Sequence, residues 1–426
     1  MTLVIIAIFA FLILSIIGLP ISFALLASTL IYFFSAGIPL NIIPIRMLRS
    51  YDSFVLLSIP FFIFMGKIMT EAKISDRLVR LADLLVGRLK GGLAHVNIVV
   101  SMFFGGITGT AIADTTAIGS IMIPSMVKQG YSKKFSAAVT AASSTMGPII
   151  PPSLMFIIYG SLAHVSIRDL FLAGAIPGVM VGLFQMVVVA IYSKKYNFPK
   201  RERKIQINEA IEIFKEAGYA LLLPIMILGG IIFGIVSPTE ASIIAVFYSI
   251  FISVFIYKTL TIKNIVKIAG ESAIETGSVS IILASASLLG WILSNEQIPL
   301  KFAELLVNSI AIKWQILLLI NLLLFVMGMF MDSIPAVIIF TPVFMPLFKM
   351  IGVDPLHAGV FICINLVTGL ATPPVGCCLF AASVISKESL EKISVAILPF
   401  IFANMIVVLL VTYIPNITLF IPLLIK

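Results

Sequence analysis

Two short stretches decide how this chain folds: TMGPIIPP at residues 145–152 and GLATPP at residues 369–374. Each places a glycine and two adjacent prolines inside a long apolar segment. A proline pair removes two backbone N–H donors, and the glycine lets the chain leave helical geometry. We therefore predict that each stretch divides a helix in two, and we call these points the first and second break.

The segments around the breaks are apolar enough for a membrane. The 426 residues are 60% hydrophobic and 11% charged, whereas soluble domains are about 45–50% apolar and about 25% charged. Apolar stretches long enough to cross a bilayer, about 20 residues, recur from Leu3 to Ile425. The expected fold is an all-α polytopic membrane protein without a separate soluble domain. Residues 3–17 lack a basic n-region and a cleavage site, so we interpret them as a retained helix.

The two breaks belong to an internal repeat. Pro151 and Pro373 differ by 222 positions, as do Gly147 and Gly369. Chance similarity between apolar segments would not keep prolines and glycines in register over more than seventy residues. The same ungapped offset relates Gly106 to Gly328, Pro124 to Pro346, Gly130 to Gly352, Pro152 to Pro374, Ser161 to Ser383 and Pro177 to Pro399.

Each repeat is predicted to contain five crossings and one re-entrant helical hairpin, with a spanning pair of helices as the alternative to the hairpin. The hairpin centres carry glycines and a carboxylate, and the membrane tolerates such backbone only where protein or a water-filled cavity covers it. An odd number of crossings inverts the second repeat, and secondary transporters use this geometry for alternating access. The first repeat is 1–192 with hairpin 93–128 and broken helix 134–162, a cytoplasmic linker is 193–217, and the second repeat is 218–426 with hairpin 314–349 and broken helix 355–386.

The net charge of +9 fits this layout. Lys and Arg gather in cytoplasmic loops, so nucleic-acid binding is not expected, and both termini are predicted to be periplasmic in a bacterial inner membrane. Lys67 ends a span on the cytoplasmic side. Ile74, Leu78, Leu81 and Leu85 form one apolar stripe, the pattern of a helix lying in the interface plane. Segments 40–52 and 260–275 have a similar mixed character and are expected to be bracing arms. The cytoplasmic loops hold Lys73, Arg77, Arg80, Arg88, Lys90, Lys128, Lys133, Lys134, Lys194, Lys195, Lys200, Arg201, Arg203, Lys204, Lys215, Lys258, Lys263, Lys267, Lys387 and Lys392.

Oxygen atoms at the hairpin tips and breaks are candidate ligands. The first half-helix of each break ends in carbonyls that suit Na⁺, and the second begins with N–H groups that suit a carboxylate. Intramembrane carboxylates are costly, so Asp114 and Asp332 are assigned to ion binding, gating or coupling, with a structural hairpin cap as the alternative. Small hydroxyls have the alternative role of joining helices. The three cysteines lack metal-ligand spacing, and the three histidines are scattered, so no metal other than Na⁺ is expected.

Three longer motifs carry a family resemblance: GITGTAIADTTAIGSIMIPSM at 106–126, MDSIPAVIIFTPVFMPL at 331–347 and GVDPLHAGVFICINLVTGLATPPVG at 352–376. Nearly end to end, the chain resembles the large membrane subunit of tripartite ATP-independent periplasmic (TRAP) transporters. The resemblance implies a separate small four-helix membrane subunit, a periplasmic substrate-binding protein, Na⁺ coupling and an elevator motion. It also implies an organic acid as solute, such as sialic acid or a C4-dicarboxylate.

The resemblance further implies two Na⁺ sites flanking one solute site. The first Na⁺ site comprises Thr108, Gly109, Thr110, Asp114, Ser144, Thr145, Gly147 and Pro148. The second comprises Met331, Asp332, Ser333, Pro335, Gly369, Thr372 and Pro373. The solute residues are Thr115, Thr116, Pro152, Ser153 and Pro374.

Two other functions compete with this interpretation. A standalone sodium symporter for divalent anions shares inverted repeats and hairpins, and only transport by the chain alone separates it from a tripartite system. An intramembrane aspartyl protease would use Asp114 and Asp332 as an acid–base pair. The segment GMFMD before Ser333 lacks a second glycine just ahead of the aspartate, and proline pairs serve no protease purpose, so no enzyme activity is predicted.

Overall fold

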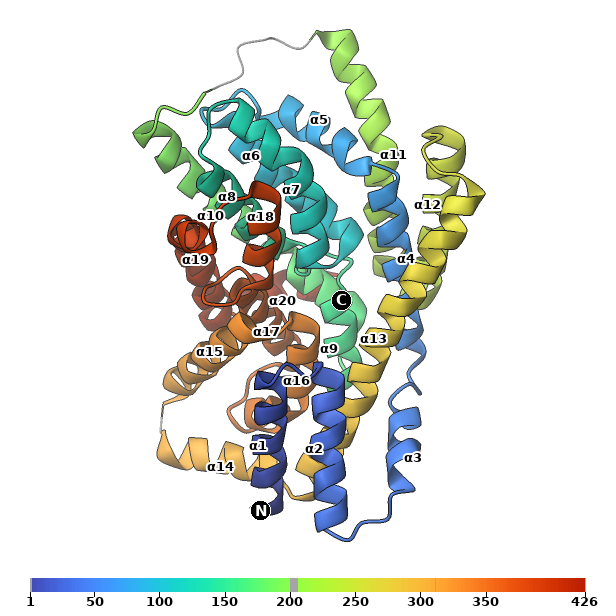
Figure 1. The fold of residues 1–426 in the computed structure, drawn as a ribbon, viewed down its shortest axis with the longest axis vertical. Coiled ribbons are helices and arrows are strands. Elements are labelled where there is room, and N and C mark those ends of the chain that lie inside the picture. The colour runs from blue at the N-terminus through green and yellow to red at the C-terminus, as the bar shows by residue number, and fades with distance from the viewer. Residues whose placement is uncertain (1, 200–205, 311, 426) are drawn as a thin grey trace.

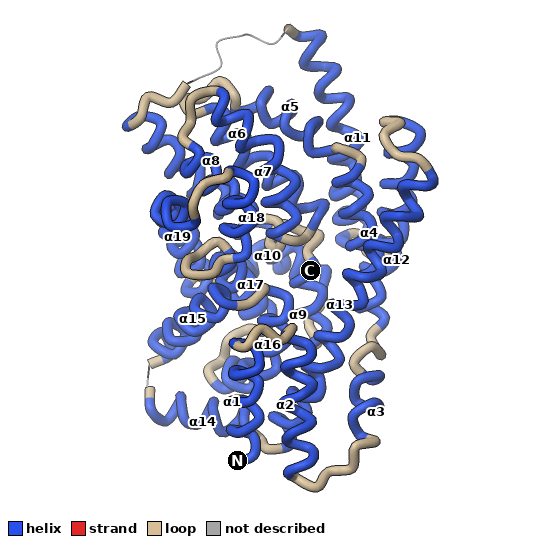
Figure 2. Tube along the Cα trace, viewed as in Figure 1, coloured by secondary structure: helices blue, strands red, loops and turns tan. Residues whose placement is uncertain are grey.

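A computed structural model describes residues 2–199, 206–310 and 312–425, and the regular structure in these ranges is helical throughout, without a β-strand (Figures 1 and 2). Lys200, Arg201, Arg203 and Lys204, predicted to be cytoplasmic, lie outside the described residues. Seven of the described helices are long and apolar enough to cross a membrane. These helices confirm the predicted all-α, multi-pass membrane fold.

The first half begins with α1 (Thr2–Ile16) and α2 (Ile21–Ser35). Each has 15 residues, fewer than the roughly 20 that a full crossing needs. The remaining elements are α3 (Ile42–Arg49), η1 (Phe54–Leu57), α4 (Ser58–Glu71), α5 (Ile74–Val86), α6 (Gly92–Thr108), α7 (Ala111–Lys128), α8 (Lys133–Ser143), η2 (Ser144–Met146), α9 (Leu154–Ala163) and α10 (Ile167–Lys195).

The second half differs from the sequence-based layout in four places. Helix α11 (Ile207–Ile232) begins inside the predicted linker 193–217. Helix α13 (Ile262–Asn295) joins the predicted arm 260–275 to the next span, because no proline interrupts it after its Thr261 capping box. Two further helices, α14 (Ile298–Ser309) and α20 (Asn416–Leu424), were not predicted. The other elements are α12 (Pro238–Phe251), η3 (Ile252–Ile256), α15 (Lys313–Phe330), α16 (Ser333–Met350), α17 (Pro355–Leu370), α18 (Cys377–Ser386) and α19 (Leu390–Tyr413).

Helix α5 packs on protein through the apolar stripe seen in the sequence. Ile74, Leu78 and Leu81 are buried, whereas Leu85 is exposed. The helix contacts α6 and α11, and Arg80 forms a 3.6 Å ion pair with Glu216 of α11. Helix α5 therefore links the first hairpin to the second half of the chain.

The two hairpins, α6–α7 and α15–α16, lie in opposite halves of the molecule in Figure 1. Each broken helix packs its first half-helix on its own hairpin: α8 contacts α6 and α7, and α17 contacts α15 and α16. The second half-helices exchange partners, because α9 packs on α16 and α18 packs on α7. The two breaks are thereby held within one interlocked unit.

Candidate ion and solute site

The tip of the first hairpin lies in backbone contact with the first break. A Cβ atom on Gly105 would stand 2.9 Å from the Cα atom of Gly147. A Cβ atom on Gly106 would stand 3.0 Å from the carbonyl oxygen of Pro151. Since any larger residue would force these segments apart, the glycines set how closely the hairpin approaches the break.

Two carbonyl oxygens converge beside Gly147. A Cβ atom on this residue would lie 3.2 Å from the Thr110 oxygen and 3.3 Å from the Ser144 oxygen. One oxygen comes from the hairpin tip and the other from the end of the first half-helix. Each oxygen accepts one backbone N–H, from Asp114 at 3.2 Å and from Gly147 at 3.1 Å respectively, and a carbonyl oxygen has a second lone pair. Backbone carbonyls at a helix break are ligands for Na⁺ in transporter cores.

Asp114 in α7 is fully buried, and neither of its carboxylate oxygens has a hydrogen-bond partner among the described residues. Its polar neighbours are Ser101 and Ser144. Their hydroxyls donate elsewhere, to Ser143 Oγ at 3.0 Å and to the Thr140 carbonyl at 2.8 Å. A buried carboxylate without a partner is strongly unfavourable. A bound cation or a proton would remove that cost.

Other residues predicted for the first ion site face different groups. The Thr145 hydroxyl donates to the Ala142 carbonyl at 2.7 Å and accepts from the Asn404 amide at 3.3 Å. The Pro148 carbonyl accepts a hydrogen bond from the Ser153 hydroxyl. Thr108 donates to the Phe104 carbonyl at 3.4 Å within its own helix, and Gly109 ends that helix in the left-handed region, with φ of 64°. Thr110, Ser144, Gly147 and Asp114 are thus the predicted residues that gather at one point.

The hydrogen bonds that Asn404 of α19 makes near the first break were not predicted from the sequence. Gln185 of α10 donates to the Ala142 carbonyl and to Asn404 Oδ1, each at 2.9 Å. Together with the bond from Asn404 to Thr145, this closes a ring of hydrogen bonds behind the first break. Nothing local in the sequence pairs residues 219 positions apart.

The second hairpin meets the second break through another glycine pair. A Cβ atom on Gly369 would stand 2.6 Å from the Cα atom of Gly328. After the break, the Gly376 N–H donates to the Met329 carbonyl at 3.2 Å. Gly369 is the repeat equivalent of Gly147, and Gly328 is the equivalent of Gly106, which is the residue after Gly105, the glycine that faces Gly147 at the first break.

Asp332 caps the N-terminus of α16. The Ser333 N–H and hydroxyl donate to its Oδ1 at 2.6 and 3.2 Å, so the capping alternative describes one of its carboxylate oxygens. The Thr372 hydroxyl donates to the Thr368 carbonyl at 2.8 Å. Met331 and Pro335 are buried, Pro373 is half-buried and Pro374 is exposed.

A cavity of about 480 Å³ is lined by residues of the first hairpin, α4 and α13. Of the five residues predicted to bind solute, Thr116 lines this cavity. Thr115, Pro152 and Ser153 are buried elsewhere, and the Thr115 hydroxyl donates to the Ala111 carbonyl at 2.9 Å. Charged residues that the sequence-based site omitted also line the cavity, namely Lys67, Glu71, Glu271 and Glu275.

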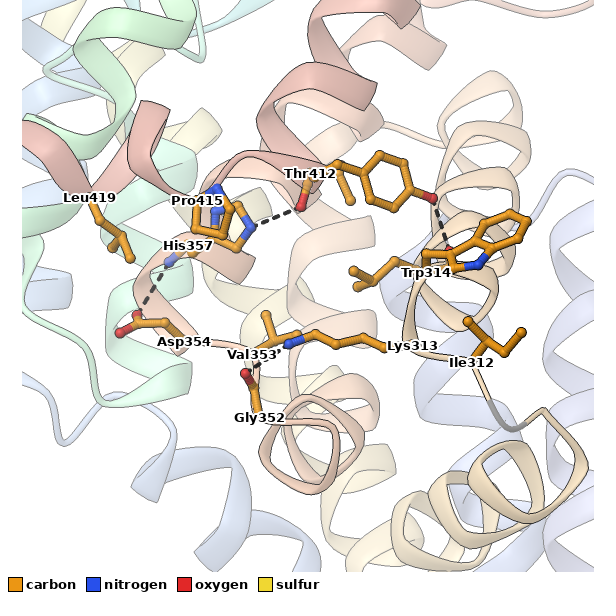
Figure 3. A pocket seen from close by; sticks show the side chains of 12 residues that line it. Ile312, Lys313, Trp314, Gly352, Val353, Asp354, His357, Thr412, Pro415 and Leu419 are labelled. Carbon is orange, nitrogen blue, oxygen red and sulfur yellow. Dashed lines mark hydrogen bonds between the residues drawn. The ribbon is translucent and has the colours of Figure 1, made fainter.

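A larger cavity of about 580 Å³ lies at the ends of α15, α17 and α19, near α20 (Figure 3). The His357 ring nitrogens lie 2.9 Å from Thr418 Oγ1 and 3.1 Å from the Thr412 carbonyl oxygen. Lys313 Nζ donates to the Gly352 carbonyl at 3.0 Å. None of the residues predicted to bind ions or solute lines this cavity, and these polar groups bond to the chain itself.

Helix α18 lies near both candidate ion sites. Cys378, near the start of this helix, lies in the neighbourhood of both Asp114 and Asp332. It is buried, and all three cysteines are free. Because α18 also packs on α7 and α8, the two candidate ion sites share one packed region.

Comparison with known proteins identifies the family of the chain. Residues 8–417 match the family model described as "Tripartite ATP-independent periplasmic transporter, DctM component". The chain belongs to this family. Because the family is a class of transporter permeases, it is not a class of enzymes.

Relatives of the DctM component carry different named solutes. The sialic acid TRAP transporter large permease protein SiaM of Vibrio cholerae is 36% identical, over 95% of each chain. The C4-dicarboxylate TRAP transporter large permease protein DctM of Rhodobacter capsulatus is 32% identical, also over 95% of each chain. The isethionate TRAP transporter permease protein DctMQ of Oleidesulfovibrio alaskensis is 38% identical over 95% of this chain, which spans 64% of that protein.

A solved structure supports the fold of the DctM component. The YdaH transporter of Alcanivorax borkumensis matches with a TM-score of 0.61 over 86% of each chain, at 13% sequence identity. At this identity the likeness concerns the fold alone. The family model and these relatives confirm the predicted large TRAP membrane subunit.

Proposed function

We propose that this DctM component is the transport subunit of a Na⁺-coupled TRAP system in the bacterial inner membrane. A periplasmic substrate-binding protein would deliver an organic acid of the sialic acid or C4-dicarboxylate type, and a small membrane subunit would accompany the chain. Both termini are proposed to face the periplasm. The named solutes of the relatives are all anions, which supports an anionic cargo here.

The observation that carries Na⁺ coupling is the unpartnered carboxylate of Asp114 beside converging carbonyls. Among the residues that the structure describes, its two oxygens have no hydrogen-bond partner. Ser144, its polar neighbour, also supplies one of the two carbonyl oxygens next to Gly147. A monovalent cation would neutralise the carboxylate and complete an oxygen shell with the Thr110 and Ser144 carbonyls. These residues fit the ion that the proposal requires.

The second Na⁺ site is proposed near Asp332 and the second break. Asp332 is held by its cap on α16, while Thr372 follows Gly369 at the end of α17. The support is the equivalence of Gly369 with Gly147 in the repeat and the matching glycine contact with the hairpin. The Thr372 hydroxyl already donates its hydrogen to the Thr368 carbonyl of α17. Its oxygen lone pairs are therefore the part of the hydroxyl that would bind Na⁺.

Alternating access is proposed to move the interlocked hairpins and broken helices against α4, α12 and α13. The exchange of half-helices between the hairpins supports motion of these elements as one body. Gly66 in α4 supports the sliding contact, because a Cβ atom there would stand 3.3 Å from the Ile107 carbonyl oxygen near the hairpin tip. An inverted pair of repeats would give the two access states related geometries.

Reconstitution tests this function against the standalone symporter. The chain is placed in liposomes with its small subunit and binding protein, and uptake of labelled succinate, N-acetylneuraminate and isethionate is measured with an inward Na⁺ gradient. The proposal expects uptake of at least one anion that requires Na⁺ and both partners. Uptake by the chain alone would establish the standalone symporter instead, and uptake driven equally by a proton gradient without Na⁺ would remove Na⁺ coupling.

A further inference from the structure

The 480 Å³ cavity has the wrong overall charge for attracting an anion. Among the described residues that line it, Lys67 is the one cation, and Glu71, Glu271 and Glu275 are carboxylates. Lys267, which does not line the cavity, forms a 3.7 Å ion pair with Glu271. Long-range attraction therefore favours cations in this cavity, and an anionic solute needs a specific local partner.

Lys67 is placed to be that partner. Its ammonium group lies 3.0 Å from the Glu275 carboxylate and donates to the Glu271 carbonyl at 3.1 Å. An ammonium group has three N–H donors, so these two contacts leave one donor for another acceptor. The Lys67 and Glu275 side chains are 28% and 44% exposed, which makes their pair accessible and easily exchanged.

The hairpin wall of the cavity supplies neutral hydrogen-bonding groups opposite the lysine. Thr116 and Ser120 in α7 donate their hydroxyl hydrogens to the carbonyls of Ile112 and Ala117 at 2.8 and 2.9 Å. Thr70 in α4 donates in the same way to the Gly66 carbonyl at 2.8 Å. Each hydroxyl can rotate to donate to a bound solute, because its present bond lies within its own helix.

We infer that Lys67 binds the anionic group of the solute and exchanges its Glu275 partner for that group when the cavity fills. This inference rests on the proposed transport of an organic anion, and it places the anion's counter-charge on α4 rather than at a break. Thr116 and Ser120 on α7 then bind the polar remainder of the solute. Release of the anion restores the Lys67–Glu275 pair.

The exchange predicts opposite changes in the dissociation constant of the anion for two substitutions. Lys67→Gln removes the solute's charged partner and should raise the dissociation constant for the anion by about tenfold or more, as expected for loss of a charge-assisted hydrogen bond. Glu275→Gln removes the competitor and should lower that constant by about two- to fivefold, the range of an exposed ion pair. A purely structural ion pair would weaken binding in both variants.

Binding is measured with the complete membrane complex in detergent and NaCl, using labelled succinate, N-acetylneuraminate and isethionate as probes. Lys67→Arg keeps the charge and should retain binding within a few-fold. Lys263→Gln removes an exposed cation of α13 that does not line the cavity and should leave binding unchanged. Stabilisation of each variant by Na⁺ is recorded in parallel and should match the wild type, which shows that the variants fold.

The outcomes separate this inference from the proposed function. If the wild-type complex binds a probe and Lys67→Gln retains the same dissociation constant, Lys67 is not the anion partner, although transport stands. Weakened binding in Glu275→Gln as well as Lys67→Gln would also overturn the exchange. If the wild-type complex binds and transports none of the three anions, the proposed function fails and the inference fails with it.

Discussion

The Gln185 side chain in α10 donates a 2.9 Å hydrogen bond to the Asn404 side chain in α19, joining the two halves of the chain behind the first break. Asn404→Leu removes this bond and the one to Thr145, leaving buried polar groups unpaired. The free energy of unfolding should fall by about 1–3 kcal/mol, measured as a lower Tm of the purified complex. Asn308→Leu, on an exposed position of α14, should leave the Tm nearly unchanged. Equal Tm values for the two variants would show that the ring does not stabilise the break.

Gly147→Ala should weaken Na⁺ binding. The added Cβ atom would stand 3.2 and 3.3 Å from the Thr110 and Ser144 carbonyl oxygens, so these proposed ligands must move. We expect the Na⁺ concentration for half-maximal uptake to rise by about tenfold or more, the loss of one good ligand. Gly218→Ala is the matched control, because no atom lies within 4 Å of its added Cβ. Unchanged Na⁺ dependence in Gly147→Ala would exclude an ion site at this point.

In Asp114→Asn, the thermal stability of the protein should no longer depend on Na⁺. Wild-type protein should gain stability as NaCl replaces choline chloride, because an ion that binds only the folded state stabilises it. The variant should lose this gain, and in choline chloride it should be at least as stable as the wild type because the uncompensated charge is absent. Thermal unfolding in both salts checks the prediction. Asp52→Asn, an exposed carboxylate, should behave as the wild type, and a full Na⁺ response in Asp114→Asn would contradict the assignment.

Gly369→Ala should destabilise the second break. Its Cβ atom would stand 2.6 Å from the Cα atom of Gly328, which is a backbone clash that no side-chain rotation relieves. Overpacking of this kind costs about 1–3 kcal/mol. Gly270→Ala has open space in the middle of α13 and should instead stabilise by about 0.5–1 kcal/mol. The two Tm values should move in opposite directions, and a shift of the same sign in both would refute the contact.

The breaks and turns of the fold can be predicted from the local sequence, because proline pairs and glycines change the backbone conformation at their own positions. The chain is interrupted at Pro151 and at Pro373, and the hairpins turn at Gly109 and before Asp332. Helix ends are less readable. The start of α11 at Ile207 and the join within α13 depend on packing and capping that overall apolarity does not encode.

The sequence predicts which backbone groups meet near the first break, but it does not predict contacts between side chains from distant parts of the chain. Thr110, Ser144 and Gly147 belong to motifs near the break and do converge. Lys67 and Glu275 lie in different spans, and only the fold brings them within 3.0 Å. Pro152 and Ser153, predicted to bind solute, are buried and do not line the 480 Å³ cavity, and Ser153 caps α9. Their role in solute binding stays a prediction.

The exchange of half-helices has a consequence for how this protein can be made and divided. Since α9 rests on α16 and α18 rests on α7, a polypeptide that stops after α10 would lack the surface on which α9 packs. Its counterpart starting at α11 would lack the surface for α18. Neither fragment should fold on its own, and co-expressed fragments should recover structure only by associating with each other. The ancestral single repeat, by the same reasoning, would have needed a second copy of itself in the membrane.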